Sequence, residues 1–191
     1  MIRPTRRRSD EARKITQVNA IEGIPSVQDK LGELASLACY VEGMVLAAEA
    51  TCSIDKYGVA KPNPRFVYGA IGLQAELYPR TILTLRELAG AGVLQLPSSY
   101  HELVNESTRG DLERYLRSPQ TAMDDRVKLF RLAWDIVGSE FGGRHLQYEM
   151  FYAGAPFVAK GYAYRNYGYD EALRSAESFL ASYGLPKGNE K

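Results

Sequence analysis

The sequence predicts an all-α protein, a helical bundle with two long helices in its first half and shorter helices after them. Apolar side chains recur every three to four residues over long stretches, and no strong alternation of apolar and polar residues favours strands. No internal repeat is visible. The 191 residues are 45% hydrophobic and 25% charged, which is typical of a globular domain with a core of its own.

The first 19 residues predict a basic, flexible tail in front of the bundle, because their first 14 carry almost no large apolar side chains. The cations are Arg3, Arg6, Arg7, Arg8, Arg13 and Lys14. No aromatic residues interleave with them, so a solvated, frayed tail is favoured over a nucleic-acid-binding arm. The bundle domain is expected over 20–185, and a second flexible tail over 186–191.

Two long helices are predicted for the first half of the bundle. The first spans about 25–52, because Pro25 suits a first helical turn and apolar residues follow at helical spacing. A loop rich in Gly, Pro and Asn follows over 55–64. The second helix spans about 65–90. It is expected to kink or split at Pro79, since proline removes one backbone hydrogen bond and clashes one turn back.

Shorter helices follow in the second half. They are expected through about 104, over 108–117 and 124–139, around 148–152, and over 156–165 and 169–183. Asp124 and Asp125 are interpreted as the acids favoured at a helix start. Arg80 is expected to pair with a carboxylate of a neighbouring helix, with a phosphate or ribose contact as the alternative. His101 is expected at the surface.

The most distinctive stretch is 139–149 (SEFGGRHLQYE). Gly142 and Gly143 let another chain or a ligand approach the backbone closely. Arg144 offers a planar cation suited to phosphate, and His145 offers a stackable, switchable ring. These four residues suit a pyrophosphate at a helix start, or a joint between two helices with a surface arginine and a core-edge histidine. On the four residues alone, the joint is favoured.

Longer segments match a known pattern. They are 27–34 (VQDKLGEL), 78–80 (YPR), 87–90 (ELAG), 96–99 (LPSS), 126–135 (RVKLFRLAWD), 148–149 (YE) and 152–154 (YAG). Together with the glycine pair, they resemble the two-component, flavin-dependent 4-hydroxyphenylacetate 3-monooxygenase large subunits. Their relatives act in pyoverdin-chromophore synthesis and 4-hydroxybutyryl-CoA dehydration. The resemblance covers about 20–185. Leu146 stands where the monooxygenases usually have an acidic residue.

The resemblance implies a fold similar to the C-terminal bundle of acyl-CoA dehydrogenases. It also implies that Gly142, Gly143, Arg144 and His145 contact FAD in a tetrameric assembly. The family's large subunits also have an N-terminal helical domain and a middle β-barrel, which hold most residues that contact the flavin ring and the phenol. The chain is therefore expected to be a fragment, a split subunit or a stand-alone bundle, and to be inactive in isolation, with no catalytic residues of its own.

The expected function follows from that resemblance: part of an aromatic hydroxylase that uses reduced FAD from a separate flavin reductase. The expected partners are the missing domains or an upstream-encoded chain, the reductase, and further copies in a homo-oligomer. The alternatives are a non-catalytic helical assembly module, or part of an acyl-CoA dehydratase- or dehydrogenase-like flavoenzyme. No metal is expected, because Cys39 and Cys52 fit no zinc or haem spacing; they are expected to be reduced and packed as small hydrophobes.

Charge and hydropathy bear on location. The net charge of +1 gives no overall attraction to nucleic acid or to an acidic membrane. No apolar run is expected to reach the roughly 20 residues that span a bilayer. The N-terminus lacks the apolar stretch of a secretory signal. The sequence therefore predicts a cytoplasmic protein with neither a nucleic-acid nor a membrane partner.

Overall fold

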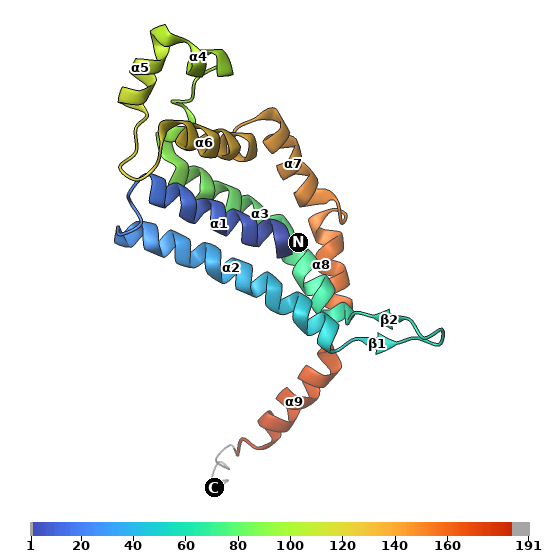
Figure 1. The fold of residues 1–191 in the computed structure, drawn as a ribbon. Coiled ribbons are helices and arrows are strands. Elements are labelled where there is room, and N and C mark those ends of the chain that lie inside the picture. The colour runs from blue at the N-terminus through green and yellow to red at the C-terminus, as the bar shows by residue number, and fades with distance from the viewer. Residues whose placement is uncertain (1, 185–191) are drawn as a thin grey trace.

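The structure is a computed structural model that describes the backbone of residues 2–184 and the side chains of residues 8–184. Its helices are α1 (Ile2–Val18), α2 (Pro25–Ala50), α3 (Pro64–Ala89), α4 (Tyr100–Val104), α5 (Glu106–Tyr115), α6 (Met123–Val137), α7 (Glu140–Phe151), α8 (Pro156–Arg165) and α9 (Tyr169–Ala181), with a 3₁₀ turn η1 (Gly90–Val93). The prediction of an all-α bundle is confirmed (Figure 1).

Helix α3 is the centre of the bundle. It packs against α1, α2, α6, α7 and α8, and Figure 1 shows α1, α2 and α3 running side by side. Of the kink or split predicted at Pro79, the split does not occur, because α3 is one continuous helix from Pro64 to Ala89. Packing against five neighbours compensates for the backbone hydrogen bond that proline removes. Arg80 donates from Nε to Glu33 of α2, as predicted.

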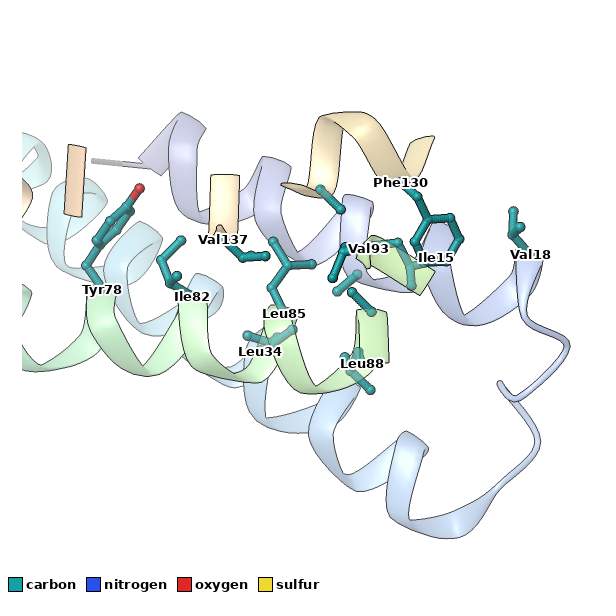
Figure 2. Close-up of a cluster of buried hydrophobic side chains, with 13 residues drawn as sticks. Ile15, Val18, Leu34, Tyr78, Ile82, Leu85, Leu88, Val93, Phe130 and Val137 are labelled. Carbon is teal, nitrogen blue, oxygen red and sulfur yellow. The ribbon is translucent and has the colours of Figure 1, made fainter. Parts of the chain in front are cut away.

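The core gathers where α1, α2, α3 and α6 meet. Its largest fully buried side chains include Ile15, Leu34, Leu85 and Phe130, one from each helix. Figure 2 shows these residues converging, with Tyr78 at one end of the row. Fully burying a side chain of this size stabilises the fold by about 1.5–3 kcal/mol.

The predicted flexible tail over residues 1–19 is wrong for the part that the structure describes. Residues 2–18 form α1, and Ala12, Ile15 and Val18 are 0–1% exposed. These three residues recur at helical spacing and bury one narrow face of α1 against the core. The face is easily overlooked, because the sequence around it is dominated by charged residues. The predicted tail over 186–191 lies outside the described residues.

A small hairpin replaces the predicted loop between α2 and α3. Strand β1 (Ser53–Ile54) pairs antiparallel with β2 (Ala60–Lys61), and the hairpin projects from the bundle (Figure 1). Asp55 holds the turn: its Oδ1 accepts from the N–H groups of Tyr57 at 2.9 Å and Val59 at 3.0 Å. These backbone hydrogen bonds hold the pKa of the Asp55 carboxyl below its usual value.

Apolar side chains on α2 and α9 remain uncovered by the residues that the structure describes. Helix α2 is long and apolar enough, by length and composition, to cross a membrane, with a mean hydropathy of 1.4 over the best 18 residues. This corrects the expectation that no such run exists. Only 17% of that window is buried. Cys39 and Cys52 are free and exposed, so the predicted packing of both is wrong.

Helix α9 extends away from the bundle (Figure 1). None of its residues is buried. The side chains of Leu173, Phe179 and Leu180 are 59–69% exposed. They recur at helical spacing, so α9 has an apolar face without a cover among the described residues.

Candidate functional site

The chain turns between α6 and α7 at Gly138 and Ser139, before the glycine pair. Ser139 is the N-cap of α7: its Oγ accepts from the N–H of Gly142 at 3.0 Å. This satisfies one of the backbone donors that a helix start leaves unpaired. Gly142 and Gly143 therefore lie in the first turn of α7. The joint between the two helices lies at Gly138 and Ser139, three to four residues before the glycine pair. The interpretation of the pair itself as the joint is therefore wrong.

The two glycines have different surroundings. A Cβ on Gly142 would lie 2.4 Å from the carbonyl oxygen of Ile136 and 2.7 Å from that of Asp135. The absence of a side chain therefore lets the start of α7 approach the end of α6. A Cβ on Gly143 would have no atom within 4 Å apart from its chain neighbours and the backbone of its own helix. Gly143 thus leaves a bare, open stretch of backbone beside Arg144.

Arg144 lies at the surface. Its Nη2 is 2.5 Å from Glu140 Oε1, and its side chain is 78% exposed. An exposed ion pair one helical turn apart contributes only about 0.3–0.5 kcal/mol, so the guanidinium is readily recruited by another anion. It also lies near the start of α7, where the helix dipole favours negative charge.

His145 points about 100° around α7 from the exposed Arg144 and faces the bundle. Its ring meets that of Tyr78 on α3 edge to face, with centroids 5.8 Å apart. On α7 it lies nearly parallel to Phe141 and Tyr148, at 6.0 and 6.3 Å. Tyr148 in turn stacks with Tyr152 at 5.4 Å. We call the four stacked rings of Phe141, His145, Tyr148 and Tyr152 the aromatic row.

A polar network behind the aromatic row joins α7 to α3. Gln74, buried on α3, donates from Nε2 to the Glu149 carboxylate and accepts from the Tyr152 hydroxyl at 3.2 Å. The same carboxylate lies 3.5 Å from Nε2 of His145. Burial, and next the Glu149 charge, raise the pKa of Tyr152. This network fixes the rotation of α7 and hence the direction in which His145 points.

A cavity of about 200 Å³ lies between His145, Arg8 of α1 and the last turns of α6. Apolar side chains of Leu132, Ile136 and Phe141 line it together with the polar groups of Arg8, Tyr78, Asp135 and His145. Burial raises the pKa of the Tyr78 hydroxyl, which faces Arg8. Arg8 was missed as a site residue, because it was placed in a tail. The available signal was its spacing to Glu11 on the helix that carries Ala12 and Ile15.

Among residues 2–184, no group of three or more His, Cys, Asp or Glu side chains is arranged to hold a metal ion. Asp124 and Asp125 lie in the first turn of α6, as predicted, and Asp124 also accepts two hydrogen bonds from Arg109 at 3.0 and 3.1 Å. His101 is exposed, as predicted.

With this geometry established, comparison with known proteins identifies the family. The family model described as 4-hydroxyphenylacetate 3-hydroxylase C terminal matches residues 11–181. The chain belongs to this family. The match begins within α1, which agrees with the contribution of that helix to the core.

Two curated relatives show the extent of the match within the family. A probable 4-hydroxyphenylacetate 3-monooxygenase of Bacillus subtilis (strain 168) is 29% identical over 154 residues, which are 81% of this chain and 32% of the relative. The oxygenase component of a 4-nitrophenol 2-monooxygenase from Rhodococcus is 30% identical over 177 residues, 90% of this chain and 34% of the relative. The chain thus spans about a third of the length of these relatives.

The comparison with solved structures supports the same family. The oxygenase component of a 4-hydroxyphenylacetate 3-monooxygenase, in complex with FAD and 4-hydroxyphenylacetate, superposes with a TM-score of 0.87 at 27% identity. The superposition covers 93% of this chain and 37% of the oxygenase component. A 4-hydroxybutyryl-CoA dehydratase from N. maritimus superposes with a TM-score of 0.79 at 17% identity, a likeness that concerns the fold alone.

Proposed function

We propose that this chain is the C-terminal helical domain of a flavin-dependent aromatic hydroxylase and contributes to FAD binding and to oligomer formation. The observation that carries the proposal is the family match over residues 11–181, together with the superposition on an oxygenase component crystallised with FAD. The cofactor, when bound and reduced, supplies the oxygen chemistry of such enzymes, and the protein supplies binding and orientation.

The start of α7 suits a phosphate group of the cofactor. The N–H groups of Gly142 and Gly143 already bond to the Oγ and the backbone oxygen of Ser139. The glycine pair therefore contributes room for approach, through the open side of Gly143, more than it contributes donors. Arg144 supplies the planar cation, which matches phosphate oxygens with two parallel hydrogen bonds. In this proposal Gly142 sets the α6–α7 packing and His145 borders the site.

The proposal also includes a flavin reductase, the missing domains, an oligomeric state and a location. Relatives named as oxygenase components suggest a separate flavin reductase as the source of reduced FAD. A chain that spans a third of those relatives suggests that an N-terminal domain and a β-barrel, on the same or an upstream-encoded chain, complete the site. The uncovered apolar faces of α2 and α9 suit a homo-oligomer, a tetramer in this proposal. A cytoplasmic location and a part in aromatic catabolism complete it.

A helical assembly module is the second candidate function, and the exposed apolar face of α9 favours it. The two candidates differ in their interaction with flavin. In an assembly module, Arg144→Ala leaves the FAD affinity of the assembled enzyme unchanged, whereas in a cofactor-binding domain it lowers that affinity. A dehydratase-like reaction has no support here beyond the shared fold.

A titration with FAD of the assembled enzyme, with the missing domains joined to this chain, tests the proposal. Replacing Arg144 with Ala removes a charge-assisted contact worth about 1.5–3 kcal/mol, so FAD affinity should fall roughly 10- to 100-fold. Arg144→Lys should restore only part of it, because an ammonium cannot form the planar fork. Arg174→Ala on α9 is the matched control and should leave FAD binding unchanged.

Two outcomes would contradict the proposal. If Arg144→Ala binds FAD like the parent with unchanged helix content, the start of α7 is a structural turn only. Alone, the chain should yield no catechol above background when supplied with reductase, NADH, FAD and a phenol. Hydroxylation coupled to the phenol under those conditions would show that no further domain is needed.

A further inference from the structure

A carboxylate lies beside one ring nitrogen of His145. Oε1 of Glu149, one helical turn further along α7, is 3.5 Å from Nε2 of His145. The Glu149 side chain is only 15% exposed, so water and salt screen this contact poorly. A carboxylate oxygen offers lone pairs and no hydrogen. It therefore favours the neutral form of the ring that carries its hydrogen on Nε2.

Helix α3 holds that carboxylate in place through Gln74, which is 7% exposed. The side-chain amide of Gln74 donates from Nε2 to Oε2 of Glu149 and, at 3.4 Å, to the backbone oxygen of the same residue. Its Oε1 accepts from the Tyr152 hydroxyl at 3.2 Å. Because the backbone oxygen of Glu149 can only accept, the NH₂ group of Gln74 must point this way. One carboxylate oxygen is thus engaged by Gln74, and the other faces His145.

The second ring nitrogen, Nδ1, remains available to a ligand. Arg8, Tyr78 and Asp135 line the cavity next to the ring, and none of the three is hydrogen-bonded to His145 in the part of the chain that the structure describes. Tyr78 meets the ring edge to face. The His145 side chain is 34% exposed, so a bound molecule can reach it.

We propose that Glu149, held by Gln74, is a positioning residue that keeps the hydrogen of neutral His145 on Nε2 and leaves Nδ1 as a hydrogen-bond acceptor. Nδ1 then accepts from a hydroxyl or N–H group of the bound ligand, and not from an ionised phosphate, which offers no hydrogen. This inference rests on the proposal that His145 borders the cofactor site. It assigns the phosphate to Arg144 and a donor group of the ligand to His145.

Nuclear magnetic resonance of the chain with isotope-labelled histidine shows which nitrogen carries the hydrogen, because the two-bond proton–nitrogen couplings differ between the two neutral forms. His101, exposed on α4, is the internal reference. With each ring titrated to its neutral form, His145 should carry its hydrogen on Nε2 in at least about a five-fold excess. An ordinary hydrogen bond contributes that much, and a carboxylate acceptor more. A majority of His145 with its hydrogen on Nδ1 would overturn the proposal.

Glu149→Gln keeps the shape of the side chain but changes the atom that faces the ring. Gln74 still donates toward position 149, so the new amide must turn its oxygen to Gln74 and its NH₂ group to His145. Nε2 must then accept, and the ratio of the Nε2–H form to the Nδ1–H form should fall at least about five-fold. An unchanged ratio, with the far-ultraviolet spectrum of the parent, would overturn the proposal.

Two further variants separate orientation from packing. Adding Gln74→Met to Glu149→Gln removes the donor that orients the new amide, and should recover about three-fold of the lost ratio. Gln74→Met alone should leave the hydrogen on Nε2, because a carboxylate has no donor in either orientation. Glu76→Gln is the matched control on α3: Glu76 is exposed and bonds Lys160 at 2.5 Å, so the ratio at His145 should not change. A change in Glu76→Gln as large as in Glu149→Gln would refute the assignment to Glu149.

Cofactor binding tests the acceptor at Nδ1. In the assembled enzyme, Glu149→Gln should weaken FAD binding roughly three- to ten-fold, because Nδ1 changes from acceptor to donor, and Glu76→Gln should not weaken it. A reversed ratio with the FAD affinity of the parent would overturn the contact between Nδ1 and the ligand. The histidine spectra need no FAD, so they remain informative if Arg144→Ala leaves FAD binding unchanged, and the two proposals fail separately.

Discussion

Adjacent glycines at the start of α7 should respond in opposite directions to the same substitution. In Gly142→Ala the new methyl would lie 2.4 and 2.7 Å from two backbone carbonyl oxygens, neither of which can rotate away. Overpacking of this kind costs about 1–3 kcal/mol, and the upper end applies when the clash is with backbone. Alanine in a helix recovers about 0.5–1 kcal/mol relative to glycine. The net loss of stability is therefore about 2 kcal/mol.

Gly143→Ala has no such clash, because only chain neighbours and the backbone of its own helix lie within 4 Å of the new methyl. Only the gain of about 0.5–1 kcal/mol remains. For a domain of this length, 1 kcal/mol moves Tm by about 2–4 °C. Gly142→Ala should thus lower Tm by about 4–8 °C, and Gly143→Ala should raise it by about 1–4 °C. Circular dichroism melts, supported by urea titrations, measure both.

A loss of stability in both variants, or no loss in Gly142→Ala, would refute this account of the α6–α7 packing. The pair also separates structure from ligand binding. In the assembled enzyme, Gly143→Ala should weaken FAD binding without loss of stability if the bare backbone at 143 is where the cofactor approaches. Unchanged FAD binding would restrict the proposed contact to Arg144.

Three further predictions concern other parts of the molecule. Phe130→Ala should cost about 3–5 kcal/mol in urea unfolding, because the ring is 1% exposed, and Leu94→Ala at an exposed site should stay within about 0.5 kcal/mol. Because folding lowers the pKa of Asp55, its contribution to hairpin order is complete above about pH 4 and is lost as pH falls through the lowered pKa. The protection factors of the hairpin amides, which are their exchange rates relative to the intrinsic rate at the same pH, should therefore fall only in acid, and equal protection factors at pH 3 and 6 would contradict this. Deleting 169–184 should leave Tm unchanged but reduce self-association in light scattering, and a lower Tm would show that α9 supports the core.

Periodicity was enough to predict the long helices within a few residues, because α2 and α3 have strong start signals and long apolar patterns. It failed for α1, where three small-to-medium apolar residues form a stripe among many cations. The buried face of α1 depends on what α3 and α6 offer from the other side, which local pattern does not contain. Pro79 shows the same limit: a local helix breaker is overridden by packing on five sides.

The residues of the candidate site could be predicted from the sequence, but the directions in which their side chains point could not. Gly142 to His145 are contiguous, yet Gly142 faces α6, Arg144 faces solvent and His145 faces α3. Ser139 as the N-cap was a readable signal, since serine at that position commonly starts a helix. Arg8 could not be connected to His145 by any spacing rule, because tertiary packing alone brings the two residues to the same cavity.

The place of α1 in the core has a consequence for how the chain folds during synthesis. α1 leaves the ribosome first, yet Asn19, just beyond its end, bonds Arg126 at a separation of 107 residues. At roughly 5–20 residues per second, α1 waits about 5–20 s before α6 arrives, and the apolar face of α3 waits a shorter time. Contacts of such long range slow folding, and the exposed faces are targets for chaperones in that interval. α9 emerges after the core residues and is not needed to close it.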